Sequence, residues 1–274
     1  MSRQTWRWVI PLAIIGGVVL LALLAPWVAP YDPNGQNLLG RLKPPGTQSR
    51  AWLYLLGSDE LGRDVLSRLI HGARVSLMVA FAAALLSGTV GVILGMLAGL
   101  LRGRVEAVVM RVVDVFMSIP AILLAILTVA VLGPGLINVI LVLALTRWPR
   151  YARVAYGQTL SIANMPYVKL ALQMGAGTTR ILWRHVFPNL VGAVTVVATL
   201  EFGLMVLFEA GLSFLGLGVQ PPTASWGSML STGRNYLETA WWIATLPGLC
   251  LFVLVLSINL LGDALRDRWD PRLR

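Results

Sequence analysis

The stretch from Asn164 to Asn189, NMPYVKLALQMGAGTTRILWRHVFPN, is a charged interruption between two long apolar segments. Pro166 suits the first turn of a helix, and mostly apolar residues follow until Gly175, where a left-handed residue would end that helix. Thr178 can then cap a second helix that leads into the next apolar segment. The pattern predicts a helix-turn-helix element that a soluble partner could grip, with an ordinary amphipathic connector as the alternative.

Composition places the chain in a membrane. Hydrophobic residues make up 57% of the 274 residues and charged residues only 12%, which excludes an ordinary soluble domain. The net charge of +10 could suggest a nucleic-acid partner. However, the basic residues lie at the ends of apolar segments rather than on one polar face, so membrane topology explains them better and no nucleic acid is expected.

Six apolar windows are long enough to cross about 30 Å of hydrocarbon, which takes about 20 residues of helix. They lie near residues 9–29, 74–100, 108–132, 136–157, 188–212 and 241–262. The fourth is interrupted by Arg147, Pro149, Arg150 and Arg153, so it either leaves the bilayer near Thr146 or continues as an interfacial helix. The chain is therefore predicted to be an all-α integral membrane protein with six transmembrane helices.

Basic residues also predict the orientation. A topology with both termini and the Asn164 loop in the cytoplasm puts 15 of the 22 basic residues inside. The first window could instead be a cleaved signal peptide, but Pro26 and Trp27 make a poor cleavage site, so we interpret it as a membrane helix.

No residue pattern in the sequence supports catalysis or a cofactor. The two lysines, Lys43 and Lys169, lack the Gly-Lys-Ser/Thr context of a phosphate-binding loop, so any ATP hydrolysis is expected in another chain. A single cysteine, Cys250, excludes an internal disulfide. His71 and His185 lack ligand spacing, so no metal is expected.

Glycines recur at helical spacing in the second window. Gly88, Gly91, Gly95 and Gly99 would permit close backbone approach to another helix. Packing within the bundle or between subunits would use this face, and a row of glycines facing lipid is the alternative.

Two segments outside the windows carry distinctive patterns. The region from Pro30 to Gly57 is rich in turn formers and is expected to be mostly irregular. Ser58 then offers an N-cap for an amphipathic helix on the outer face. Between Glu209 and Leu230, closely spaced glycines and prolines predict that the chain turns and re-enters or lies along the outer surface.

Four acidic residues fall within or near the windows, namely Asp114, Glu201, Glu209 and Asp263. Ionisable groups in a bilayer usually face protein or water, so each is a functional candidate. Asp114 lies three residues from Arg111, which predicts an ion pair with a structural role or a place on a pathway. Glu201 lies about 20 Å past Pro188 along a helix and is the preferred pathway residue. Glu209 would lie near the outer mouth, meeting a cationic solute group or solvent.

Several motifs occur in an order that resembles ATP-binding-cassette (ABC) importer permeases of the dipeptide, oligopeptide and nickel class. They are GSDELGRDVLSRLIHGARVSL before the second window, MRVVDVFMSIPAILLA, the opening loop, EAGLSFLGLGVQPPTASWGSML and the ending GDALRDRWDPRLR. The loop resembles the family's EAA loop, which has Glu-Ala-Ala, three residues and Gly. Ala171 and Gly175 match that pattern, whereas Lys169 and Leu170 replace the Glu and the first Ala. This replacement leaves the ionic details of docking open.

The resemblance implies a type I importer permease (MetI-like) core, residues 74–274, with a cytoplasmic coupling loop at about 158–187. Residues 1–73 would form an additional N-terminal transmembrane helix and an extracytoplasmic segment. The implied contacts with a cytoplasmic ATPase are Tyr167, Val168, Lys169, Leu170, Ala171, Met174, Gly175 and Ala176. The implied gate or binding-protein contacts are Asp59, Gly62, Arg63, Asp64, Gln220 and Trp226. The motif GSDELGRDVLSRLIHGARVSL, which contains the first four of them, could equally be an interfacial anchor with no contact to the solute.

The same resemblance implies the partners and the location. A second, homologous permease, two ATPases that hold ATP and Mg, an extracytoplasmic solute-binding protein and membrane lipid are expected, in a bacterial or archaeal cytoplasmic (inner) membrane. Di- or oligopeptides are the preferred solutes, with nickel or another metal chelate or glutathione as alternatives. An ion-gradient-driven secondary transporter using Glu201 and Asp114, and a structural subunit of a membrane enzyme, are alternatives from other classes.

Overall fold

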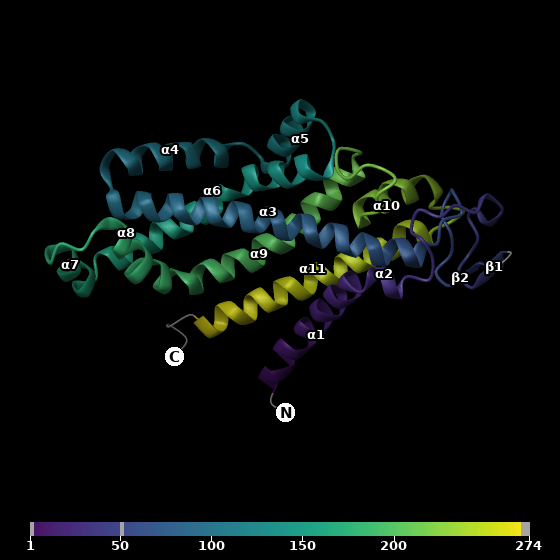
Figure 1. The fold of residues 1–274 in the computed structure, drawn as a ribbon, viewed down its shortest axis with the longest axis horizontal. Coiled ribbons are helices and arrows are strands. Elements are labelled where there is room, and N and C mark those ends of the chain that lie inside the picture. Colours follow the sequence, from purple (N-terminus) through teal and green to yellow (C-terminus); the bar gives the residue numbers. More distant parts are fainter. Residues whose placement is uncertain (1–2, 50–51, 270–274) are drawn as a thin grey trace.

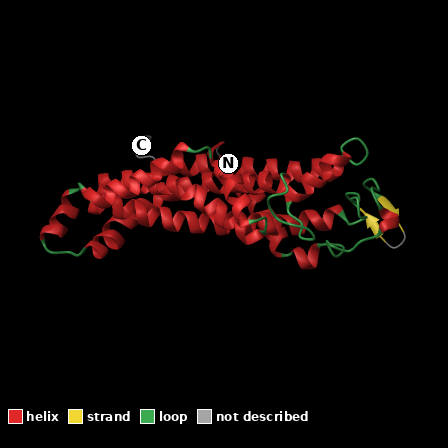
Figure 2. Ribbon diagram, turned by 90° about the horizontal axis from the view of Figure 1, so that it is seen from above, coloured by secondary structure: helices red, strands yellow, loops and turns green. Residues whose placement is uncertain are grey.

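A computed structural model describes residues 3–49 and 52–269. The described chain is an elongated bundle of long helices with small elements gathered at its two ends (Figure 1). Within the described ranges, strands occur at one end of the bundle, where β1 (Thr47–Ser49) pairs antiparallel with β2 (Trp52–Tyr54) in the register Thr47 to Tyr54 (Figure 2). The all-helical fold class predicted from the sequence therefore holds for the bundle itself.

The central pair of the bundle is α3 (Val65–Leu101) and α6 (Leu136–Ala163). The row of glycines on α3 lies against α6: a Cβ on Gly91 would lie 2.4 Å from the Trp148 carbonyl oxygen, and one on Gly95 would lie 2.3 Å from that of Ala152. A larger residue at either position would push the helices apart. The glycine row thus serves helix packing within the chain and does not face lipid.

The third apolar window is not one straight helix. The structure divides it between α4 (Gly103–Ser118) and α5 (Ala121–Leu132), which meet at an angle of 93°. Ile119 is extended, with φ −96° and ψ 130°, because the residue before a proline is disfavoured in the α conformation, and Pro120 itself has no N–H to continue the helix. The window predicted over residues 108–132 is therefore two helices with a sharp bend between them, and together they are apolar enough for one broken span or a re-entrant loop.

The segment between α6 and the next long helix contains α7 (Pro166–Gln173), α8 (Thr178–Ile181) and the π-helical η2 (Leu182–Val186). These elements lead into α9 (Phe187–Phe214). The helix α7 lies at the end of the bundle opposite the strands (Figure 1). The helix of the fourth window continues past Thr146 without interruption, because α6 ends only at Ala163.

Two further helices complete the bundle. The N-terminal helix α1 (Arg3–Leu23), followed by the short α2 (Ala25–Val28), packs on α11 (Trp242–Trp269) and on α3. The short elements η1 (Leu38–Gly40), α10 (Trp226–Gly233) and η3 (Arg234–Tyr236) lie at the strand-bearing end. Buried side chains from α3, α6, α9 and α11 form the main hydrophobic core.

The prediction of a helix beginning at Ser58 is wrong, because α3 begins at Val65. The Asp64 side chain caps α3 by accepting a 2.7 Å hydrogen bond from the Ser67 N–H. Gly62 has φ +71°, a left-handed conformation that a helix does not contain. Residues 58–64 therefore form a loop, and the amphipathic pattern that follows belongs to the first turns of α3.

Within the described residues, three helices are long and apolar enough to cross a membrane: Val65–Leu101, Thr178–Phe214 and Trp242–Arg268. The bent pair of α4 and α5 would make a fourth span, and the apolar part of α1, Trp8–Leu23, is shorter. The helix α6 lacks a sufficiently apolar window because three arginines interrupt its middle. The structure thus describes an all-helical membrane protein with three or four spans by this criterion.

Candidate functional site

The helix α7 has the local geometry that the sequence predicts. Pro166 occupies the first turn, and Gly175, with φ +82°, follows the C-cap residue Met174. The Ala176 N–H donates to the Ala171 carbonyl at 3.0 Å, and the Gly175 N–H donates to the Leu172 carbonyl at 3.0 Å. This pair of bonds is the Schellman motif, which satisfies the last carbonyls of a helix and fixes the direction of the following chain.

Most of α7 is exposed, including large apolar side chains. Met174 is 79% exposed and Leu170 57%, and Tyr167 and Lys169 are also exposed. Ala171 and Ala176 are half-buried and Gly175 is exposed, whereas Val168 is fully buried. Of the eight predicted contact residues, Val168 therefore anchors α7 to the bundle and has no surface to offer a partner.

An aromatic and polar contact joins α7 to the start of α9. The Asn189 side-chain N–H donates to the Tyr167 hydroxyl at 3.2 Å, and the Tyr167 and His185 rings lie 6.0 Å apart. His185 belongs to η2, which runs directly into α9. The helix α7 is therefore connected to a long membrane helix by side-chain contacts as well as through the chain.

The predicted cap of the second helix is wrong. At the start of α8, Gly177 is the N-cap residue and Thr178 is the first helical residue, so Thr178 is not the cap.

Glu201 lies in a buried ionic cluster between α9 and α6. Its carboxylate is 3.5 Å from Arg147 Nη1 and 3.2 Å from Arg150 Nη1. The side chains of Arg147 and Glu201 are 4% and 3% exposed, and the Arg147 guanidinium also stacks 3.9 Å from the centre of the Phe208 ring. The cation–π contact and the Glu201 carboxylate together offset the cost of burying the positive charge of Arg147 in the bundle interior.

Asp114 does not form the predicted pair with Arg111. Its carboxylate contacts the Arg153 guanidinium of α6, and both side chains are about half exposed. Nearby, the Tyr156 hydroxyl donates to Glu106, whose carboxylate lies 3.5 Å from Arg102. Asp114 pairs with Arg153 on the adjacent helix α6 rather than with Arg111 on its own helix. Spacing in the sequence shows only possible partners on the same helix, so it could not reveal this one.

Glu209 is fully buried, so it is neither a solvated end residue nor open to solute at an outer mouth. Its two carboxylate oxygens accept 2.8 Å hydrogen bonds from the hydroxyls of Ser76 and Ser213. The Ser76 oxygen in turn accepts from the Trp226 backbone N–H at 3.3 Å. Glu209 therefore joins α3, α9 and α10 at the strand-bearing end.

The predicted gate residues are mostly inside the protein. Asp59, Gly62, Arg63, Asp64 and Trp226 are buried, and only Gln220 is exposed. The Asp59 carboxylate accepts from the backbone N–H groups of Leu61 and Arg63, each at 2.9 Å, and from Arg63 Nε at 2.6 Å. The indole N–H of Trp226 donates to the Leu69 carbonyl at 3.0 Å. In this conformation these buried side chains hold the loop in shape, and a partner can touch only Gln220 among the six.

Burial also affects the acids beside Asp59. Loss of hydration raises the pKa of Glu60, and the neighbouring Asp59 carboxylate raises it further. Burial likewise raises the pKa of Asp64, although the hydrogen bonds from Ser67 oppose that change. Arg63 pairs with Asp59 and Glu60, and Arg68 pairs with Asp59, whereas the Asp64 carboxylate accepts hydrogen bonds from Ser67.

The Gly62→Ala variant is expected to lose more stability than Gly46→Ala. Both glycines have positive φ, +71° and +79°, so both changes incur the left-handed backbone penalty of about 1–2 kcal/mol. Only at Gly62 would the added Cβ meet an atom, the Asn37 carbonyl oxygen at 1.8 Å. Overpacking adds about 1–3 kcal/mol.

Thermal unfolding of the two variants, purified side by side in detergent, measures this difference. A clearly lower Tm for Gly62→Ala is the expected result. Equal shifts in the two variants would show that the contact between Gly62 and Asn37 does not hold the loop.

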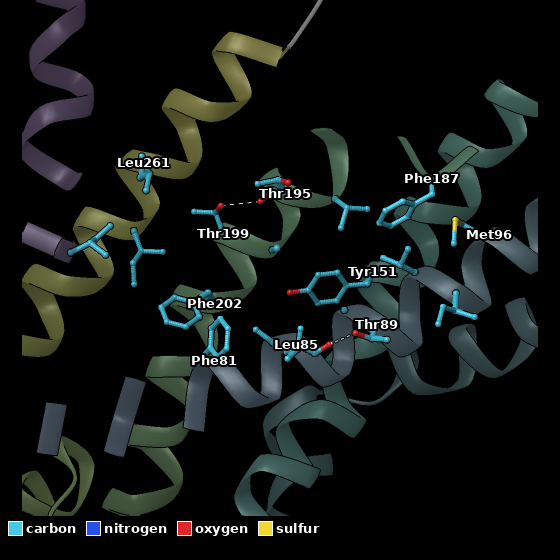
Figure 3. Close-up of a pocket in the computed structure, with 18 of the residues that line it drawn as sticks. Phe81, Leu85, Thr89, Met96, Tyr151, Phe187, Thr195, Thr199, Phe202 and Leu261 are labelled. Carbon is cyan, nitrogen blue, oxygen red and sulfur yellow. Dashed lines mark hydrogen bonds between the residues drawn. The ribbon is translucent and has the colours of Figure 1, made fainter. Parts of the chain in front are cut away.

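A large cavity of about 600 Å³ lies between α1, α3, α6, α9 and α11. Figure 3 shows Tyr151 pointing into it, with Phe81, Phe187 and Phe202 around it and the bonded pairs Thr199–Thr195 and Thr89–Leu85 at its walls. Its lining is almost entirely apolar, and Asp114, Glu201 and Glu209 are not part of it. The predicted pathway acids and this cavity are therefore separate features.

Metal binding has no structural support among the described residues, because no group of three or more His, Cys, Asp or Glu side chains could hold an ion there.

Long apolar helices together with a short exposed helix at one end define the class of this chain as a helical integral membrane protein. Residues 91–274 match the family described as binding-protein-dependent transport system inner membrane component, and residues 8–45 match the N-terminal TM domain of oligopeptide transport permease C. The chain belongs to the binding-protein-dependent transport system inner membrane component family. It is a multi-pass, non-catalytic permease subunit of an ABC importer, a system that includes ATPase and solute-binding partners.

Curated relatives agree with this assignment, and a solved structure shares the fold. The di/tripeptide transport system permease protein DppC of Pseudomonas aeruginosa strain UCBPP-PA14 is 47% identical over 261 residues, covering 94% of this chain and 85% of that protein. The nickel transport system permease protein NikC of Escherichia coli strain K12 is 44% identical over 269 residues, covering 97% and 95%. A chain of the MetNI methionine ABC transporter shares the fold, with a TM-score of 0.58 and 21% identity over 73% of this chain and 95% of that one.

The family assignment confirms the resemblance found in the motifs. It also excludes the two alternatives from other classes, the ion-gradient-driven carrier and the structural subunit of a membrane enzyme.

Proposed function

We propose that this chain carries di- or short oligopeptides, delivered by the solute-binding protein, across the inner membrane. The relative with 47% identity is named for di- and tripeptide transport, and other relatives over the full chain are named for peptide transport. Nickel or a nickel chelate is the second candidate, supported by the nickel permease at 44% identity. Comparison of the uptake of radiolabelled dipeptide and of nickel by the reconstituted importer separates the two.

The proposed orientation puts α7 in the cytoplasm. The described ends of α1 and α11 that lie nearest the termini are on the side of the molecule away from β1 and β2, as α7 is (Figure 1). The excess of basic residues at these positions supports an inward location. The strands, α10 and the loop at Asp59 would then face the binding protein.

Six crossings follow if α1, the bent pair of α4 and α5, and the arginine-bearing α6 each traverse the bilayer once, together with the three strongly apolar spans. In this arrangement residues 1–73 form an N-terminal helix and an outer segment, and residues 74–274 form the permease core. The polar side of α6 would face a second, homologous permease across the translocation pathway, because half-exposed arginines cannot face hydrocarbon.

The single observation that carries the coupling role is the exposed apolar surface of α7 on a rigid Schellman-capped turn. Closure of the ATPase pair on ATP would push α7, and the contact between Tyr167 and Asn189 would pass the movement to α9. The bundle would thereby exchange inward-facing and outward-facing states. Val168 would hold α7 to the bundle during this movement.

The Leu170→Asp variant is expected to lose its ATPase partners. A charged residue in the centre of an apolar interface costs about 2 kcal/mol or more, which corresponds to about thirtyfold in affinity. Co-purification in mild detergent measures the ATPase recovered with the tagged permease.

Leu38→Asp is the control, because Leu38 is similarly exposed at the opposite end of the molecule. Equal recovery of ATPase with Leu170→Asp and with the unaltered chain would contradict docking at α7.

A further inference from the structure

The exposed side of the second half of α6 is polar. Its exposed residues there are Arg150, Arg153, Gly157, Gln158 and Ser161. By contrast, exposed positions in the first half of the same helix are apolar, as at Leu141 and Leu145. A polar helix face inside a bilayer lies against protein or water, because lipid cannot satisfy its charges. This face therefore marks the side of the permease that turns away from lipid.

Arg150 lies at the middle of this helix. It is 14 residues from Leu136, about 21 Å along a helix whose whole length is about 42 Å. Glu201, its partner, lies equally far along α9. The cluster is thus placed half-way between the α7 end and the strand-bearing end, where a solute in transit is farthest from both.

The charges of this region do not balance. Arg147, Arg150 and Arg153 contribute three positive charges, and Glu201 and Asp114 contribute two negative ones. Arg153 pairs with Asp114, and the buried Arg147 shares Glu201 with Arg150. One positive charge therefore has no negative partner, and it lies on the exposed polar face of α6.

Arg150 is the residue that carries this excess to the surface. Its side chain is 55% exposed, and within the described part of the chain it makes one hydrogen bond, from Nη1 to Glu201 Oε1. A guanidinium has five N–H donors in a planar fork, so the free edge of Arg150 can receive a carboxylate with two parallel bonds. Its contact with Glu201 fixes the orientation of that fork.

We propose that Arg150 lines the translocation pathway and binds the carboxylate of the solute in transit. This inference rests on the proposed function, since peptides carry a terminal carboxylate. Arg147 cannot serve because it is buried, and Arg153 is neutralised by Asp114. Glu201, the residue preferred from the sequence, positions the arginine and does not itself meet the solute.

The first test concerns the pathway and does not depend on which solute is carried. Because Cys250 is the single cysteine, a Cys250→Ser background allows one reporter thiol at a time. In the assembled importer, an Arg150→Cys thiol is expected to react with a membrane-impermeant, charged methanethiosulfonate in at least one nucleotide state. Gln220→Cys is the reactive control, and Phe252→Cys, on an exposed apolar stretch of α11, is the unreactive one. An Arg150→Cys thiol that stays unreactive in every state would overturn the proposal, because the second permease would then cover the position.

The second test concerns the carboxylate. The reconstituted importer with Arg150→Gln is expected to carry a free dipeptide at least tenfold more slowly, and its C-terminal amide within twofold of the unaltered rate. Arg150→Lys is expected to restore part of the rate for the free dipeptide, and Arg153→Gln to lack this selectivity. Equal loss for both peptides would show a structural role and overturn the assignment, as would no loss for either.

A different result shows that the proposed peptide transport, and not the role of Arg150, is wrong. The unaltered importer then carries neither the dipeptide nor its amide, while the Arg150→Cys thiol still reacts. In that case the uptake rates of the unaltered importer and of Arg150→Gln are compared with a carboxylate-bearing solute that the cognate binding protein binds.

Discussion

The Gly175→Val variant is expected to abolish solute uptake and the solute-dependent stimulation of ATP hydrolysis, while the chain still inserts into the membrane. Gly175 has φ +82°, and a β-branched residue is strongly disfavoured in that conformation. An added Cβ would meet no atom within 4 Å, so the penalty comes from the backbone alone. It would break the two hydrogen bonds that end α7 and redirect the chain toward α8.

The control is Gly177→Val, two residues further along the same exposed turn. Gly177 has φ −67° and ψ 154°, which valine adopts readily, and its position is equally free of steric contact. Uptake and ATPase activity of reconstituted complexes, with membrane-inserted protein quantified in each preparation, give the comparison. Full uptake by Gly175→Val would refute the idea that a rigid turn transmits the ATPase movement; equal loss in both variants would indicate a surface contact in place of a backbone requirement.

The largest effect on stability is expected from Glu201→Ala. Removal of the carboxylate leaves the buried Arg147 without its counter-charge, which costs about 3–5 kcal/mol. The temperature at which the detergent-solubilised chain loses its monodisperse elution peak measures this effect. Asp114→Ala is the matched control, because the pair of Asp114 and Arg153 is about half exposed and such pairs contribute about 0–1 kcal/mol.

A double variant separates the ion pair from its surroundings. Arg147→Met combined with Glu201→Leu replaces the buried charges by apolar groups, and replacements of this kind are often neutral or stabilising. We expect this variant to recover most of the stability that Glu201→Ala loses. Its Arg150 would have lost its orienting carboxylate, so uptake should stay low even where the fold is restored. A double variant as unstable as Glu201→Ala would mean that the cluster does more than balance charge.

Local chemistry explains which structural features could be predicted from residues alone. Pro166 at the first turn of α7 and Gly175 at its end depend on backbone sterics within a few residues, and both predictions are confirmed. The glycine row on α3 likewise predicted close helix packing, although the sequence did not show that α6 is its partner. The start of α3 could not be predicted in this way. Ser58 is a residue type that commonly caps helices, but Asp64 is the N-cap of α3.

Residue composition and order are enough to establish the membrane class, the ends of α7 and, through the order of the motifs, the family. The partners of the charged residues follow only from the folded arrangement of the helices. Glu201 meets arginines 51 and 54 residues away, Glu209 meets Ser76 at a separation of 133, and Asp114 pairs with Arg153 instead of Arg111. The physical reason is that backbone conformation responds to neighbouring residues, whereas the state of a buried charge depends on whichever distant groups the folded helices bring beside it.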